Sequence, residues 1–224
     1  MNSRNSLQTR RSSSNTDKCE SVQVHFDENI KSPRLTRIDW LVAARDALIT
    51  EGKDALKIER LAKKLSVTRG GFYWHFHGRD DLLDALLISW EKETNVLFEQ
   101  ALHGDHADGM SEFCALCRSW VEENVYNSAY DSAVRDWARV SNRAAQAVKR
   151  VDRKRLDIIK RIFLNIGYPE NESFIRARIS YFHQVGYYTL GLGETRPQRR
   201  KLAPLYIEAL TGQKVSYKDV FPQD

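Results

Sequence analysis

LKIERLAKKLSVTRGGFYWHFHGRDDLLDALL, residues 56–87, is the stretch that decides the fold. Its first part places Ile58, Leu61, Ala62 and Leu65 at helical spacing on one apolar face. The positions between them are mostly charged, as expected for the solvent side of an amphipathic helix. The period breaks after residue 65, so we predict a short helix followed by a tight turn.

A second short helix is predicted from Thr68 to His75. Thr68 can cap it, because a threonine hydroxyl accepts a hydrogen bond from a free backbone N–H at a helix start. Phe72 and Phe76 are four residues apart and share one face, which we expect to join a small core with Val67. Two short helices joined by a tight turn form a helix-turn-helix, whose second helix can enter the major groove of DNA.

Two adjacent glycines, Gly70 and Gly71, are the unusual feature of this second helix. Each costs about 1 kcal/mol relative to alanine within a helix. They indicate either a weak helix or a face that approaches DNA or a neighbouring helix closely. Arg69 can contact a guanine edge or a phosphate. The same helix offers bulky groups with polar edges, namely Tyr73, Trp74 and His75.

Charge is concentrated around this motif. The 224-residue chain has a net charge of +5. Residues 34–80 hold ten Lys or Arg against six Asp or Glu, a net of +4, as expected for phosphate contacts.

Three cysteines do not suggest a secreted disulfide scaffold. No apolar stretch reaches the length of a membrane span, and the polar N-terminus lacks the apolar core of a signal peptide, so we expect a cytoplasmic protein.

The N-terminal third of the chain divides into an arm and a small domain. Residues 1–33 are rich in Ser, Asn and Arg and predict a flexible polar arm. An idle tail is the more common interpretation, and an arm that lies along DNA is the alternative. A helix capped by Thr36 should run to Glu51 and end at Gly52. With the two motif helices it forms a three-helix DNA-binding domain at residues 34–80.

Residues 81–224 predict a larger helical domain, and the whole chain reads as all-α with about nine helices. The next helix begins at Asp80 or Asp81, and we expect it to connect the small domain to the rest. The expected helices are Asp80–His103, Ser111–Tyr126, Ala129–Ser141, Ala144–Ile166, Glu172–Leu192 and Arg196–Leu210. The charged run KRVDRKRLDIIKRIF (149–163) is interpreted as a solvated helix face. The tail after Gly212 carries no prediction.

The last two long helices are apolar over more than a narrow stripe. Such helices need burial on two sides, which suggests the core on one side and a partner subunit on the other. The residues predicted for this dimer interface are Ile175, Ile179, Phe182, Val185, Gly186, Leu202, Leu205, Tyr206 and Ala209.

Two further motifs contain residue types that serve in metal, redox or enzyme chemistry. The loop HGDHADG (103–109) has ligand-type side chains, but its spacing matches no defined metal site. Cys114 and Cys117 form a C-x-x-C on a predicted helix, where small buried hydrophobes are expected and oxidant sensing is the alternative. No nucleophile–base–orienter set and no glycine-rich phosphate loop stand out. We therefore predict no enzyme activity, no metal and no cofactor.

Residues 67–83, VTRGGFYWHFHGRDDLL, resemble the recognition-helix signature of the tetracycline-repressor (TetR) family of bacterial regulators. The similarity covers about Thr36 to Leu87. The residues that fit the signature are Thr68, Phe72, Tyr73, Trp74, His75, Phe76, Arg79, Asp81 and Leu82. The segment VRDWARVSNRAAQAVKRVDRKRLDIIKRIFLNIGYP (134–169) is more weakly similar to the C-terminal domain of some TetR-like regulators.

The resemblance implies a role for each matching position. Thr68, Arg69, Gly70 and Gly71 would face the DNA groove. Tyr73, Trp74 and His75 would touch phosphates or thymine methyl groups, and Lys57 and Arg79 would contact phosphates. Phe72 and Phe76 would be core. The resemblance also implies a homodimer formed by the last two large helices, with each subunit reading half of a palindromic operator.

The leading functional hypothesis is a transcriptional repressor released from DNA by a small-molecule effector that binds the C-terminal domain. The residues predicted to line its pocket are Trp90, Phe113, Trp120, Tyr126, Trp137 and Tyr187. Aromatic residues of this kind more commonly serve as plain core. The alternative is a helix-turn-helix regulator or adaptor without a small-molecule ligand, and activation in place of repression also stays open.

Overall fold

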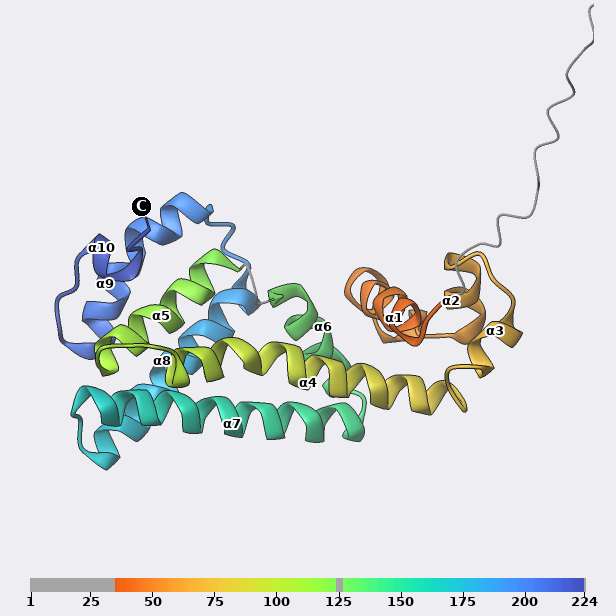
Figure 1. Ribbon diagram of the computed structural model, residues 1–224, viewed down its shortest axis with the longest axis horizontal. Coiled ribbons are helices and arrows are strands. Elements are labelled where there is room, and N and C mark those ends of the chain that lie inside the picture. Colours follow the sequence, from red (N-terminus) through yellow and green to blue (C-terminus); the bar gives the residue numbers. More distant parts are fainter. Residues whose placement is uncertain (1–34, 124–126, 224) are drawn as a thin grey trace, which may run out of the picture. The chain divides into compact units, whose positions relative to one another are not determined.

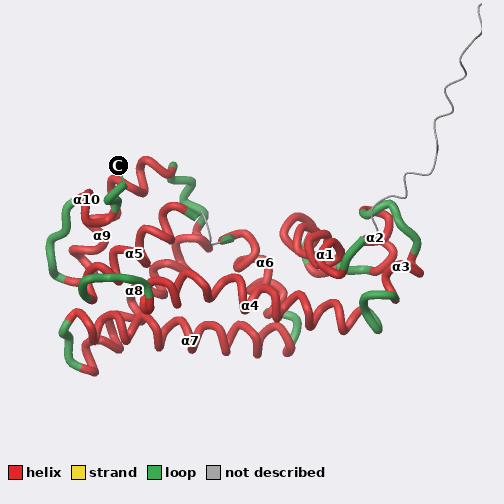
Figure 2. The backbone as a smooth tube through the Cα atoms, viewed as in Figure 1, coloured by secondary structure: helices red, strands yellow, loops and turns green. Residues whose placement is uncertain are grey.

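The computed structural model describes residues 35–123 and 127–223, which belong to one compact unit. Within these ranges the chain contains helices and loops and no strand (Figure 2). The predicted polar arm, residues 1–33, lies outside the described residues. The elements in chain order (Figure 1) are α1 Arg37–Glu51, η1 Lys53–Ala55, α2 Ile58–Lys64, α3 Arg69–Tyr73, α4 Arg79–His103, α5 Gly109–Glu122, α6 Ser128–Ala138, α7 Asn142–Ile166, α8 Glu170–Leu190, α9 Arg196–Thr211 and α10 Tyr217–Val220.

Helix α1 begins and ends where the sequence predicts. The Thr36 side chain accepts from the backbone of Asp39, and the Asp39 carboxylate accepts from the backbone of Thr36, which forms a capping box. Gly52 ends the helix with φ of 79°, a conformation that glycine adopts without strain. Thr68 occupies the cap position of α3, but its hydroxyl makes no capping hydrogen bond, so that part of the prediction is wrong. Helix α4 starts at Arg79, just before the predicted position.

The first hydrophobic core joins α1, α2 and α3 to the first half of α4 and to α6 and α7. Trp40 packs edge-on against Phe72 at 5.2 Å between ring centroids, and Phe72 stacks on Phe76 at 5.2 Å. Both phenylalanines are buried as predicted, although α3 ends at Tyr73. Val67 is 37% exposed and does not enter the core as expected, since the turn carries it outward.

The second hydrophobic core lies among the far half of α4, α5, the far half of α7, α8, α9 and α10. It includes Val220 and Phe221 from the chain's end, a segment for which the sequence carried no prediction. Ser216 caps α10 through a capping box with Asp219, and Arg118 donates to the carbonyl of Val220 at 2.9 Å. The tail is therefore part of the folded domain.

Helices α4 and α7 lie side by side, and α4 contributes to both cores (Figure 1). The first core therefore continues across residue 80, where we place the domain boundary, because Trp90 of α4 and Trp137 of α6 belong to it. The boundary itself stays a prediction. No helix among the described residues combines the length and the apolar character needed to cross a membrane.

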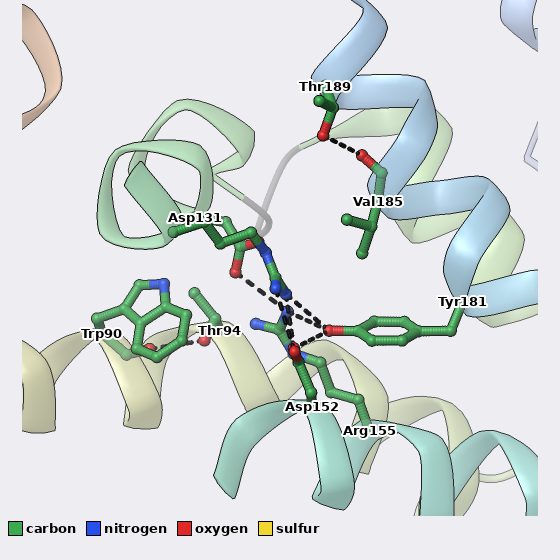
Figure 3. Close-up of polar contacts among 9 residues, drawn as sticks. Trp90, Thr94, Asp131, Asp152, Arg155, Tyr181, Val185 and Thr189 are labelled. Atoms are coloured by element: carbon green, nitrogen blue, oxygen red, sulfur yellow. Dashed lines mark hydrogen bonds and ion pairs between the residues drawn. The ribbon is translucent and has the colours of Figure 1, made fainter. Parts of the chain in front are cut away.

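A buried ionic network ties α6, α7 and α8 together. Arg155, which the sequence placed on a solvated face, is fully buried and donates to Asp131 at 3.1 Å and to the Tyr181 hydroxyl at 3.2 Å. The Tyr181 hydroxyl donates to Asp152 at 2.6 Å (Figure 3). Arg135 completes the network by donating to Asp131 at 2.8 Å. Each charge in this interior thus has an opposite partner, as a buried charge requires.

The network holds Asp131 ionised. Burial alone would raise the pKa of the Asp131 carboxyl, but the adjoining guanidinium groups of Arg155 and Arg135 lower it below its ordinary value. Arg155 also lies over the Phe98 ring of α4, at 5.1 Å from its centroid. The network therefore fixes how α6, α7 and α8 pack beside α4.

Candidate nucleic-acid interface

Residues 68–76, here called the recognition segment, follow a sharp turn after α2. Ser66 adopts a left-handed conformation with φ of 56°, and the backbone N–H of Val67 donates to the carbonyl of Ala62 at 2.9 Å. This turn sends α3 away from α2 as in a helix-turn-helix. The segment anchors itself through Phe72 and Phe76 and exposes Thr68, Arg69, Gly70, Tyr73 and Trp74. The exposed residues all belong to the predicted DNA-binding set.

The two glycines are not required by the fold of the described chain. A Cβ atom at Gly71 would meet nothing within 4 Å in the described structure, and one at Gly70 would meet only the Thr68 hydroxyl at 3.7 Å. Neither glycine has the positive φ that would demand its flexibility. Close packing against a neighbouring helix, one of the two explanations for glycine here, therefore does not apply within the chain.

The predicted cations differ in their surroundings. Lys57 is exposed at the start of α2. Arg69 forms an ion pair with Glu59 of α2 at 3.2 Å, and both side chains are well exposed. Arg79 donates from Nε to the carbonyl of Leu56 at 2.7 Å, so it ties the first residue of α4 to the end of η1. Arg79 thus has a structural role that the sequence did not predict.

Tyr73, Trp74 and His75 are placed in different ways. The Trp74 ring is 78% exposed. The Tyr73 ring is half exposed and packs edge-on against Phe72 at 5.4 Å. His75 is half-buried, and its carbonyl accepts from Arg37 at 2.6 Å. The first two therefore lie at the surface, whereas the backbone of the third is held by the domain.

Arg37 is a residue that sequence reasoning missed. Besides the carbonyl of His75 it contacts Asp81 at 3.4 Å, and its guanidinium lies 4.1 Å from the centre of the Phe76 ring. The backbone N–H of His77 donates to Asp81 and lowers the pKa of that carboxyl. Arg37 and Asp81 thus close the loop between α3 and α4. Only contacts across 38 and 44 residues reveal this role, so no local pattern signals it.

The residues predicted for a ligand pocket do not come together in one place. Trp120 and Tyr187 line one cavity between α5, α8 and α9. Trp90 and Trp137 are buried in the first core, and Phe113 packs against Phe163 of α7 at 4.9 Å in the second. These three are core residues in this structure, the more common role of buried aromatics. Tyr126 lies outside the described residues.

Most of the residues predicted for a dimer interface are exposed on α8 and α9. We call the exposed apolar side chains of α8 and α9 the α8–α9 face; it comprises Phe174, Ile175, Ile179, Phe182, Leu205, Tyr206 and Ala209. Val185, Gly186 and Leu202 are half-buried. The opposite sides of the same helices enter the second core through Ala177, Tyr181, Ala203 and Ile207.

The remaining two motifs are the cysteine pair on α5 and the loop 103–109. Cys114 and Cys117 are buried free thiols on α5. Burial raises the pKa of Cys114 to about 11 and that of Cys117 well above its ordinary value, so both are protonated near neutral pH. In the loop 103–109, His103 lies 3.5 Å from Glu99, and a ring nitrogen of His106 lies 3.3 Å from the carbonyl of Gln100. These contacts lie at the end of α4.

Comparisons with known proteins agree with this geometry. Residues 41–86 match the family model of bacterial regulatory proteins of the tetR family. The HTH-type transcriptional regulator SrpR of Pseudomonas putida is 37% identical over 54 residues, which are 24% of this chain and 25% of that protein. The HTH-type regulator TtgW, also from Pseudomonas putida and itself uncharacterised, has the same identity over 54 residues and 40% of its length. The chain therefore spans less than half the length of these curated relatives.

Solved structures match over far more of the chain. SCO4454, a TetR-family transcriptional regulator from Streptomyces coelicolor, superposes with a TM-score of 0.67 at 20% identity, over 79% of this chain and 88% of that one. SmeT, the repressor of the Stenotrophomonas maltophilia multidrug efflux pump SmeDEF, has a TM-score of 0.61 at 16% identity, over 85% and 96%. These TM-scores show that the chain shares the fold of both proteins. Residues 41–86 thus match the tetR family of bacterial regulatory proteins, and over 79% of its length the chain has the fold of SCO4454, a TetR-family regulator.

Proposed function

We propose that the protein is a DNA-binding transcriptional repressor that binds a palindromic operator as a homodimer and leaves it when a small molecule binds the C-terminal domain. The observation that carries the proposal is the recognition segment, which buries Phe72 and Phe76 and leaves Arg69, Gly70, Tyr73 and Trp74 at the surface. Residues 41–86, which include this segment, match the family model of bacterial regulatory proteins of the tetR family, and two relatives of part of the chain are named HTH-type transcriptional regulators; both support DNA binding. The protein would act in the cytoplasm.

In this proposal α3 enters the major groove with the side that carries Gly70 and Gly71 towards the bases. A helix without side chains at two adjacent positions brings its backbone close to the groove floor, so base reading rests on Arg69, Tyr73 and the shape of the DNA. Lys57 would contact a phosphate from the start of α2. Glu59 holds Arg69 at 3.2 Å in the free protein, and that guanidinium would exchange Glu59 for a guanine edge on binding.

The α8–α9 face supports the proposed homodimer. Ile179 and Phe182 are each more than half exposed, and several large apolar side chains exposed on two neighbouring helices are typical of a protein interface. A two-fold axis through this face would give two copies of α3, as a palindromic operator requires. In this proposal residues 34–80 bind DNA, and residues 81–224 form the dimer and bind the ligand.

The test is selection of duplexes bound by the full-length protein from a random-sequence library, followed by gel-shift titration of the selected duplex. Arg69→Ala is expected to lose about 1–3 kcal/mol of operator affinity and to relax the preference at one base pair of each half-site. Because this variant also frees the Glu59 carboxylate, Arg69→Ala combined with Glu59→Gln separates lost recognition from added repulsion.

Arg139→Ala is the matched control, since Arg139 is an exposed cation on the C-terminal domain that pairs with Asp136. It should bind the selected duplex as the unmodified protein does. Selection of no common sequence, or full selectivity in the Arg69→Ala variant, would refute the assignment of α3 as the recognition helix.

A further inference from the structure

A cavity of about 50 Å³ lies between α5, α8 and α9, beside the α8–α9 face. Aromatic rings form much of its wall. The His183 ring lies 4.7 Å from the Tyr206 ring and 6.4 Å from the Tyr187 ring, measured between centroids. Trp120 closes the cavity from α5, and Gln184 lines it from α8. Such a wall favours a flat apolar molecule that stacks on rings.

Two buried donors on this wall have no acceptor among the described residues. The indole N–H of Trp120 and the side-chain amide N–H of Gln184 make no hydrogen bond there, although the residues are only 4% and 6% exposed. Leaving a buried donor unsatisfied costs about 1–3 kcal/mol. Both residues line the same cavity, so one bound acceptor group would serve either or both.

Two further polar side chains of the wall, those of Tyr187 and Arg199, already have partners. The Tyr187 hydroxyl donates to Glu194 at 2.9 Å. Arg199 donates to the carboxylate of Glu123 at 2.6 Å and to the carbonyl of Trp120 at 2.6 Å. Among the buried side-chain atoms of the wall, the two that lack a hydrogen-bond partner in the described part of the chain are therefore the donors of Trp120 and Gln184.

The described residues of the wall carry no net charge. Its carboxylate, Glu194, and its guanidinium, Arg199, cancel. Burial lowers the pKa of His183, which keeps that ring neutral near pH 7. Burial raises the pKa of the Cys117 thiol, which stays protonated. A charged ligand would thus lose its hydration without gaining a counter-ion.

We propose that this cavity binds a small neutral molecule with one aromatic ring and an oxygen acceptor, which accepts hydrogen bonds from Trp120 and Gln184. A cavity that holds benzene has about 150 Å³, so a one-ring ligand must displace part of the wall. Tyr206 is the wall residue that can give way, because it is 39% exposed whereas Trp120 and Gln184 are buried.

Tyr206 also belongs to the α8–α9 face, so displacing it changes the surface on which the second subunit is proposed to lie. Resting on the proposed function, this gives the ligand a route to the DNA-binding domains: it alters the dimer geometry and thereby the spacing of the two α3 helices. The proposal for the cavity itself does not depend on DNA binding.

The test uses the full-length protein, isothermal titration calorimetry and two probes of similar size. Acetophenone has one ring and a carbonyl oxygen; in isopropylbenzene a methyl group replaces that oxygen. We expect acetophenone to bind about tenfold more tightly, the effect of about 1.4 kcal/mol from a satisfied donor. Benzoate, which is similar in size but charged, should bind more weakly than acetophenone.

Gln184→Leu removes the amide at nearly constant volume. It should abolish most of the preference for acetophenone while isopropylbenzene binds at least as tightly as before. Gln100→Leu, the same change at an exposed position of α4, should alter neither affinity. Ala203→Leu fills the cavity and should weaken both probes, with circular dichroism and thermal melting showing that each variant is folded.

Equal affinity of the two probes for the unmodified protein, or an unchanged preference in folded Gln184→Leu, would overturn the assignment. So would the absence of heat from acetophenone up to its solubility limit. Gel shifts with the selected duplex are run separately. If acetophenone binds the cavity but the protein binds no duplex, the cavity stands and the proposed function fails. If the protein binds DNA but acetophenone does not bind, the proposed DNA-binding function stands and the proposal for the cavity fails.

Discussion

The recognition segment and the α8–α9 face both expose large side chains, yet their chemistry differs. In the recognition segment the exposed rings are Tyr73 and Trp74, which carry polar edges, and an Arg–Glu pair lies beside them. The α8–α9 face exposes Ile175, Ile179 and other purely apolar groups. Polar-edged rings with cations suit a hydrated, anionic partner, whereas aliphatic groups suit a dry one. Exposure alone therefore does not identify the partner.

The two regions also differ in what lies behind the exposed residues. Helix α3 is a single short helix that relies on Phe72 and Phe76 for its position. Helices α8 and α9 are long and are anchored by the second core on their opposite sides. The small helix is held by two rings and by the Arg37–Asp81 contact, so its placement follows that of α1 and α4.

The largest effect is expected at the α8–α9 face. Ile179→Asp would bury an unpaired carboxylate in the proposed interface, which costs about 3 kcal/mol or more and weakens the dimer by about a hundredfold or more. Sedimentation equilibrium measures the dissociation constant.

Asn171→Asp adds the same charge at an exposed position in the first turn of α8 and should leave the dimer intact. If Ile179→Asp keeps the dimer constant of the unmodified protein, the contrast between the two surfaces disappears and the α8–α9 face is not the interface.

A smaller effect is expected at the glycines. Gly71→Leu should weaken operator binding by about tenfold, or about 1.4 kcal/mol, because a bulky side chain would separate the helix from the groove. Thermal stability should not fall, since space surrounds Gly71 and leucine is the better helix former.

Gly71→Ala provides the graded comparison, with a smaller loss of binding and equal or higher stability. The interpretation fails if the Leu variant binds the operator as tightly as the Ala variant, or if loss of binding only follows loss of folding.

The smallest effect is expected at Lys57. Lys57→Ala should weaken binding nearly uniformly across DNA sequences and reduce the slope of log affinity against log salt by about one. Lys92→Ala, an exposed lysine of α4 with the same change in charge, should leave the slope unchanged. Equal slopes for the two variants would remove Lys57 from the phosphate contacts.

Much of the local structure could be predicted. Thr36, Gly52 and the apolar period of α2 are local signals, and the structure confirms the helix that Thr36 and Gly52 delimit. The end of the chain could not be read this way: α10 has four residues, too few for a periodic pattern, and only packing of Val220 and Phe221 against the second core makes it visible. The prediction that the Thr68 hydroxyl caps α3 failed. A threonine can occupy the N-cap position without its hydroxyl accepting a hydrogen bond from the backbone of the helix.

The same distinction between local signals and long-range packing applies to the candidate sites. The recognition segment was found because its residue types lie close together in sequence. The cavity beside α5 was not, because its wall combines residues from three helices, and Trp90, Trp137 and Phe113 have the same aromatic character but lie elsewhere. Arg155 shows the limit most clearly: its sequence neighbours are exposed cations, yet it is fully buried beside Asp131.

By itself, the sequence determined where α1 begins and ends, which side chains share a helix face and where the positive charge is concentrated. These follow from hydrogen bonding and geometry within a few residues of chain. Only the tertiary structure decided which apolar residues are covered: Ile38 and Val140 are exposed, whereas Trp40 and Val134, close to them in sequence, are buried. Burial depends on which other helix lies against a face, and that contact joins residues far apart in the chain. For residues 56–87 the short-range information sufficed, whereas the α8–α9 face and the cavity beside it exist only once the helices have packed.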